Sequence, residues 1–157
     1  MLVSLKPLTA LTADDLMTRN VVVIPQRMSL RAAASILSKS SVTGAPVVDE
    51  TGKCVGVISS VDFLRFAQGE NRPNISRSDS CVCTAWQIVE MEQVPVEEVC
   101  NYMTKDPVMV SPSATIMEVA KAMMDAHIHR VIVVDAKNRP IGIVSSTDIV
   151  ATVAREE

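Results

Sequence analysis

The chain has 157 residues, of which 48% are hydrophobic and 21% charged, a composition typical of a globular protein with one domain or two small ones. A net charge of −3 and an aromatic content of 3% argue against the basic tracks and stacking platforms of nucleic-acid-binding proteins, so we expect no nucleic-acid partner. No apolar run approaches the roughly 20 residues of a membrane span, and the first residues do not resemble a signal peptide, so we expect no membrane partner and a cytoplasmic location.

The first half of the chain predicts a strand, a helix, two strands and a second helix. The helical pattern is clear, because Leu30, Ala33 and Leu37 recur on one helix face. A turn between two apolar runs predicts a hairpin. In chain order, we expect a short capped helix at 12–17, a strand at 21–24, a helix from 30, strands at 45–48 and 54–58, and a helix that opens at Ser60.

A segment at 68–93 follows, whose first half is polar and holds Gly69, Pro73, two Asn and three Ser, and this composition predicts an exposed linker. A further helix, from Val96 to Tyr102, is expected to lead into the second half. We therefore divide the chain into a first repeat at 10–67, a linker at 68–93 and a second repeat at 94–154.

The second half repeats the first at an offset of 86 residues. Gly-Val-Ile-Ser-Ser-Val-Asp at 56–62 returns as Gly-Ile-Val-Ser-Ser-Thr-Asp at 142–148. From Leu16 to Leu64, eleven of 49 positions match their counterparts, where chance predicts about 3. Thr115 and Glu118 have capping-box spacing at the start of the corresponding helix. The duplication predicts the same element order in both halves.

Together these motifs resemble the CBS domain, named after cystathionine β-synthase, as a tandem pair. The matching motifs are Met-Thr at 17–18 and 103–104, Gly-Ala-Pro-Val-Val-Asp at 44–49, His-Arg-Val-Ile-Val-Val-Asp at 129–135 and the closing Gly-h-h-Ser-x-x-Asp, where h is apolar. The resemblance implies an α+β fold of two β-α-β-β-α repeats packed as a pseudo-twofold pair. It also implies a homodimer of such pairs.

Many proteins of that family bind AMP, ADP, ATP or S-adenosylmethionine in clefts between the repeats. Their Ser or Thr hydroxyl contacts phosphate, and their Asp carboxylate contacts the ribose. The resemblance therefore implies that Ser59 with Asp62, and Ser145 with Asp148, bind an adenosine nucleotide or S-adenosylmethionine. It implies no required cofactor.

The residue chemistry agrees with that assignment. A helix N-terminus carries partial positive charge and attracts phosphate, a serine adds a hydroxyl donor, and an aspartate accepts from both hydroxyls of a ribose. Gly56 and Gly142 leave space for a backbone or a ligand to approach. The adenine base is expected to lie against Val22 and Val108. The same Ser and Asp residues are also ordinary helix caps, and duplication copies caps too, so both interpretations stay open.

The two copies differ at one point. His129 and Arg130 stand where the first copy has Thr43 and Gly44. Arginine offers a two-pronged donor to phosphate, and the resemblance places a basic residue of this kind near nucleotide phosphates. We expect His129 and Arg130 to contribute to one site and expect the two sites to be unequal. The alternative is that Arg130 pairs with a surface carboxylate.

The sequence leaves three alternative functions open. The first is a non-enzymatic regulatory module that binds an adenosine nucleotide and signals to an unidentified regulated protein. The second is an interaction or dimerisation module with empty clefts. The third is a small enzyme or metal protein, suggested by Cys81, Cys83, His127 and His129, although their spacing matches no closed zinc motif and no catalytic constellation stands out.

Overall fold

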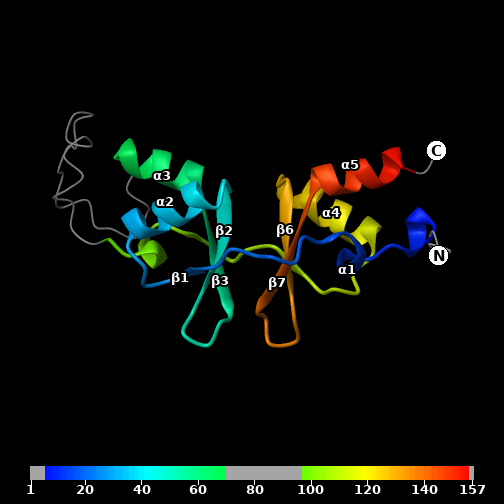
Figure 1. Ribbon diagram of the computed structural model, residues 1–157, viewed down its shortest axis with the longest axis horizontal. Coiled ribbons are helices and arrows are strands. Elements are labelled where there is room, and N and C mark those ends of the chain that lie inside the picture. Colours follow the sequence, from blue (N-terminus) through cyan, green and yellow to red (C-terminus); the bar gives the residue numbers. More distant parts are fainter. Residues whose placement is uncertain (1–5, 70–96, 156–157) are drawn as a thin grey trace. The chain divides into compact units, whose positions relative to one another are not determined.

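The computed structural model describes residues 6–69 and 97–155, which divide into two compact units (Figure 1). The first-repeat unit contains residues 22–50, 55–69 and 97–106. The second-repeat unit contains residues 107–155, joined by 6–21 and 51–54. Both units are mixed α+β, as the duplication predicts, and no helix in the described ranges is long and apolar enough to span a membrane.

The sheet of the first-repeat unit has four strands in the order β1, β2, β3, β4. Their bounds are Ile24–Pro25, Gly44–Val48, Cys54–Ser59 and Thr104–Lys105. β1 runs parallel to β2, and β4 runs antiparallel to β3. The strand expected at 21–24 is therefore shorter and later, because Val22 packs beside the core instead of pairing. β2 and β3 form the hairpin that the sequence predicts.

Two amphipathic helices, α2 (Leu30–Lys39) and α3 (Ser60–Ala67), belong to this unit. Ser29 caps α2 by accepting a hydrogen bond from the backbone N–H of Ala32 at 3.2 Å. The expected helical face enters the core, where Leu30, Ala33 and Leu37 are buried. Val47 of β2 and Ile58 of β3 complete this aliphatic core and are fully buried.

The second-repeat unit is built alike. Its three-stranded sheet has the order β5, β6, β7, with bounds Met109–Val110, Arg130–Val134 and Pro140–Ser145. Its main helices are α4 (Ile116–Ala126) and α5 (Ser146–Ala154), which contact each other, and it also holds η1 (Leu8–Ala10) and α1 (Ala13–Leu16). The expected box at Thr115 and Glu118 is present, since Glu118 accepts from the Thr115 N–H at 2.7 Å.

The opening segment of each repeat, up to Val21 in the first and up to Asp106 in the second, packs in the unit of the other repeat. Thr18 forms an antiparallel bridge with Ile143, through N–H to O distances of 2.9 and 3.1 Å. Thr104 and Lys105 take the equivalent edge as β4, beside β3. The prediction of a helix from Val96 to Tyr102 was wrong. From residue 97 on, the chain forms only one 3₁₀ turn, η3 (Val99–Asn101), and then extends and pairs as β4.

In each of these contacts, a methionine side chain packs directly against a glycine. A Cβ added to Gly56 would lie 2.5 Å from Met103 Sδ and 2.8 Å from the Thr104 carbonyl oxygen. A Cβ added to Gly142 would overlap Met17 Sδ and lie 2.7 Å from Met17 Cγ. The glycines therefore leave room for the incoming segments, which is the backbone approach that the sequence suggests at these positions.

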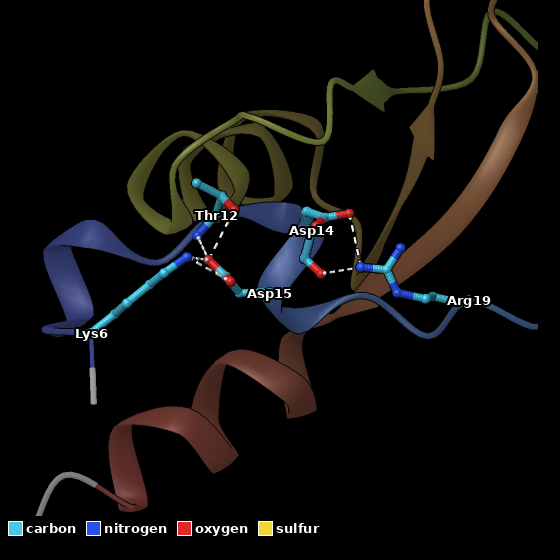
Figure 2. A network of polar contacts seen from close by, with 5 residues as sticks. All are labelled: Lys6, Thr12, Asp14, Asp15 and Arg19. Carbon is cyan, nitrogen blue, oxygen red and sulfur yellow. Dashed lines mark hydrogen bonds and ion pairs between the residues drawn. The ribbon is translucent and has the colours of Figure 1, made fainter. Parts of the chain in front are cut away.

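Polar contacts fasten the N-terminal segment around α1 (Figure 2). Lys6 Nζ lies 2.9 and 3.1 Å from the two carboxylate oxygens of Asp15, whose Oδ2 also accepts from the Thr12 N–H and hydroxyl. Arg19 Nη2 donates to the Asp14 carbonyl and carboxylate. The Lys6 bond and the Thr12 N–H lower the pKa of Asp15 from 3.8 to about 2. The expected short helix at 12–17 and its cap are thus confirmed.

Candidate functional site

The candidate site consists of two capping boxes, one at the start of α3 and one at the start of α5. In the first, Asp62 Oδ2 accepts from the Ser59 N–H at 2.8 Å and from the Ser59 hydroxyl at 3.2 Å. In the second, Asp148 Oδ2 accepts from the Ser145 N–H and hydroxyl, both at 2.8 Å. The capping interpretation of these motifs is therefore realised in the structure, in both copies.

The boxes are placed by the strands that precede them. β3 ends at Ser59 and β7 ends at Ser145, so each serine turns the chain from sheet to helix. The next serine donates its N–H across the hairpin: Ser60 to the Thr43 carbonyl at 2.8 Å, and Ser146 to the His129 carbonyl at 2.9 Å. This cross-hairpin bond uses a helix N–H that the sequence alone leaves unpaired, so fewer such donors remain for an anion.

The two boxes are not equally exposed or equally closed. Asp62 is 5% exposed and is buried among the residues of its unit, whereas Asp148 is half-buried. The Ser145 hydroxyl also accepts from the Asp148 N–H at 3.2 Å, which completes the reciprocal cap of α5. The first box is therefore a buried carboxylate, and the second a tighter cap nearer the surface.

The residues opposite the boxes also differ. Arg130 opens β6 and is the direct cross-strand partner of Ser145 on β7. Gly44 opens β2 and lies against Ser59, since a Cβ there would be 3.3 Å from Ser59 Cβ. We call Gly44, Ser59 and Asp62 the first half-site, and Arg130, Ser145 and Asp148 the second half-site.

The remaining residues expected at the site differ in their exposure and in the unit to which they belong. His129 is exposed and adjoins the second half-site through its carbonyl bond to Ser146. Val22 and Val108 are half-buried and pack against the cores of the first-repeat and second-repeat units, respectively. Val22 lies just before β1 and Val108 just before β5, and their role against an adenine base stays a prediction.

The metal or redox interpretation gains no support from the described residues. Within 6–69 and 97–155, no three His, Cys, Asp or Glu side chains gather closely enough to hold a metal ion. Cys81 and Cys83 lie outside the described residues. Burial, together with a contact to Glu98, raises the pKa of the Cys100 thiol, which works against thiolate chemistry there.

Comparison with known proteins relates most of the chain to one family. A model of the CBS domain matches residues 13–69 and 96–155. Among curated relatives, CBSX2, a chloroplastic CBS domain-containing protein of Arabidopsis thaliana, is 28% identical over 150 residues, which cover 88% of this chain and 62% of the plant protein. A homoserine O-acetyltransferase of Methanococcoides burtonii is 32% identical over 142 residues, which cover 90% of this chain and 24% of the enzyme. The chain thus matches less than two thirds of either relative's length.

Two solved structures extend the comparison to ligands. CBSX2 in complex with AMP superposes with a TM-score of 0.69 at 26% identity, covering 92% of this chain and 96% of that one. The CBS domain pair of protein MJ0100, in complex with 5′-methylthioadenosine and S-adenosylmethionine, superposes with a TM-score of 0.71 at 25% identity, covering 94% and 99%. Both neighbours are CBS pairs that hold adenosine compounds.

Proposed function

Because this chain belongs to the CBS domain family, as a tandem pair, we propose that it is a regulatory module that binds an adenosine nucleotide or S-adenosylmethionine at its two half-sites. The observation that carries the proposal is the twice-built Ser-x-x-Asp box at a strand-to-helix junction, in a chain whose structural neighbours hold AMP, 5′-methylthioadenosine and S-adenosylmethionine. The module is not an enzyme, and it passes the bound state to a partner protein.

Each box has the chemistry that a nucleoside needs. The Ser145 bonds end on Oδ2 of Asp148, so Oδ1 of that carboxylate is the oxygen that a ribose hydroxyl approaches. The cap fixes the carboxylate before the ligand arrives, and a fixed acceptor loses little side-chain entropy on binding. Phosphate lies toward the N-terminus of α5, where the helix dipole and Arg130 favour negative charge.

Calorimetry and thermal unfolding test the proposal with AMP, ADP, ATP and S-adenosylmethionine, on protein shown by mass spectrometry to be free of small molecules. A ligand present at about ten times its Kd adds about 1.4 kcal/mol to the free energy of unfolding. Asp148→Ala should lose affinity while its circular dichroism spectrum is unchanged. No shift with any of the four compounds would contradict the proposal.

A second function, a ligand-free interaction module, is favoured by the internal closure of both boxes and by apolar side chains on the closing helices. Val61 and Leu64 of α3 are 50% and 61% exposed, and Val150 and Val153 of α5 are 66% and 52% exposed. Such residues commonly mark contact surfaces. This module forms a homodimer without ligand, so sedimentation should give a dimer that Leu64→Glu or Val150→Glu dissociates, and Asp148→Ala should change nothing beyond stability.

A cytoplasmic location and the regulated protein remain part of the first proposal. Crosslinking in a cell extract with and without the best ligand, followed by mass spectrometry, should identify a partner whose recovery changes with ligand. Because a ligand shifts an equilibrium only through unequal affinity for two states, the recovery should no longer change with ligand in a variant that lacks both aspartates, Asp62→Ala with Asp148→Ala.

A further inference from the structure

Two methionines lie on one face of α4, away from its buried side. Met117 is 67% exposed and Met124 is 74% exposed, the two highest values among the large apolar side chains that the structure describes. They are seven residues apart, so two turns of the helix bring them to the same face, about 10 Å apart along its axis. The buried side of α4 consists of Ile116, Val119 and Met123. Met117 and Met124 are therefore not core side chains of the second-repeat unit.

The equivalent face of the first repeat is polar. At the places 86 residues earlier, α2 carries Arg31 and Ser38, and both are exposed. The position before Ser38 is buried in both copies, as Leu37 in α2 and as Met123 in α4. The two helices thus share their core side and differ on their solvent side, so packing does not explain the two exposed methionines.

Exposure decides which thioethers an oxidant in solution can reach. A methionine thioether is soft and apolar, and its oxidation gives a sulfoxide, which is polar. Met17, Met103 and Met123 are 8%, 5% and 4% exposed, so the protein packs around their side chains. Met117 and Met124 lack this cover. A small oxidant therefore reaches these two thioethers without any opening of the fold.

The oxidant that fits this chemistry is a hydroperoxide, of which hydrogen peroxide is the simplest. The thioether sulfur attacks one peroxide oxygen, and an S–O bond forms as the O–O bond breaks. The proton on the transferred oxygen passes to the departing hydroxide, which becomes water. The sulfur loses two electrons and the peroxide gains them. Each sulfoxide adds a hydrogen-bond acceptor to α4, so oxidation makes its solvent face polar, as that of α2 already is.

We propose that Met117 and Met124 form an oxidation site, at which a hydroperoxide converts an apolar helix face into a polar one while the fold is kept. The site lowers the affinity of this face for other apolar surfaces, because a sulfoxide loses its hydration when it is covered. Methionine sulfoxide reductases return both sulfoxide epimers to the thioether, so the change is reversible. Neither methionine belongs to a half-site, so this inference goes beyond the proposed function and depends on no ligand.

Peptide mass spectrometry of the full chain after graded treatment with hydrogen peroxide tests the site. Met117 and Met124 should oxidise about tenfold faster, or more, than the buried Met17, Met103 and Met123, which serve as controls within the same chain. At the dose that oxidises the exposed pair, the circular dichroism spectrum and the urea midpoint of unfolding should be unchanged, and retention on a hydrophobic-interaction column should fall. Methionine sulfoxide reductases should restore the retention.

Two variants that conserve side-chain volume assign the effect to the pair. Met117→Leu with Met124→Leu removes both thioethers, so peroxide should no longer lower the retention at that dose. Met123→Leu is the matched control, because it removes the neighbouring buried thioether and should respond to peroxide as the unmodified chain does. The inference is overturned if either exposed methionine oxidises no faster than Met123, if oxidation of the pair unfolds the chain, or if the double variant loses as much retention as the unmodified chain. Each of those results leaves the proposed function standing.

Discussion

The Met17 side chain fills the space next to Gly142 at the edge of β7. A Cβ added to residue 142 would lie 2.7 Å from Met17 Cγ, so the space is available only because residue 142 is a glycine. Met17 is 8% exposed and belongs to the core of the second-repeat unit. The pair joins the N-terminal segment to the closing strand just before Ser145. Met103 and Gly56 repeat the arrangement before Ser59.

Gly142→Ala should therefore lower the free energy of unfolding by about 1–3 kcal/mol, because the added methyl overpacks the edge of the sheet. Chemical denaturation followed by circular dichroism measures the loss. Met17→Ala alone should also destabilise, because it leaves a cavity. The double variant should lose less than the sum of the two single losses, since the new methyl fills part of that cavity. Additive losses would show that the two side chains do not share this space.

Variants in the caps of α4 and α5 can separate an effect on stability from an effect on ligand binding. Thr115→Ala and Ser145→Ala each remove a capping-box hydroxyl in the same unit, and each should cost about 1 kcal/mol of stability. Under the proposed function, Ser145→Ala should in addition weaken AMP binding in calorimetry, and Thr115→Ala should leave it unchanged. Equal binding by both variants would assign Ser145 to capping alone.

Asp15 should make the stability depend on pH in the acid range. Its pKa falls from 3.8 to about 2 on folding, chiefly through the Lys6 hydrogen bond and then the Thr12 N–H. Folding therefore favours the charged carboxylate, whose stabilisation is complete above about pH 4 and is lost as the pH falls toward 2. Urea denaturation should find Asp15→Asn less stable than the unmodified chain at pH 6, with the difference shrinking by pH 3.

Asp14→Asn is the matched control for that measurement. Asp14 pairs with Arg19 in the same segment, with both side chains about half exposed, so its loss should change stability little at any pH. A pH-independent difference for Asp15→Asn would contradict the role assigned to its lowered pKa.

An aromatic pair should contribute to the first-repeat unit. Phe66 of α3 and Tyr102, which follows η3, meet edge to face with ring centroids 5.0 Å apart at 85°. A double-mutant cycle with Phe66→Leu and Tyr102→Leu should give a coupling free energy of about 0.5–1.5 kcal/mol. The cycle is measured by thermal or urea unfolding. A coupling near zero would mean that the rings contribute by burial alone.

The sequence predicts the elements inside each repeat because their signals are local. Helical spacing around Leu30, the box at Thr115 and Glu118, and the turn of each hairpin all lie within a few residues. It misses the pairing of Thr18 with Ile143 and of β3 with β4, because those contacts depend on residues far apart in the chain. The signal that could have indicated them is the recurrence of Met-Thr near the start of each repeat together with a glycine in β3 and in β7.

The two Ser–Asp pairs were predictable from the sequence, whereas their burial and their further hydrogen bonds were not. The duplication identifies Ser59 with Asp62 and Ser145 with Asp148, and the structure builds both pairs as boxes. What a sequence does not contain is how deeply each carboxylate is buried, or that the Thr43 and His129 carbonyls take a helix N–H. Those features arise from packing across each hairpin.

The placement of the N-terminal segment also has a consequence for how the chain acquires its structure. Residues 6–21 are synthesised before their partners, because Thr12 and Thr18 pair with Thr115 and Ile143, about 100 residues or more later in the chain. The second-repeat unit is therefore incomplete until Ile143 has been synthesised, and Ala13 and Met17 lack their core partners until then. Because contacts between residues far apart in the chain form slowly, we expect the pairing of Thr18 with Ile143 to be a late step in the folding of the second-repeat unit.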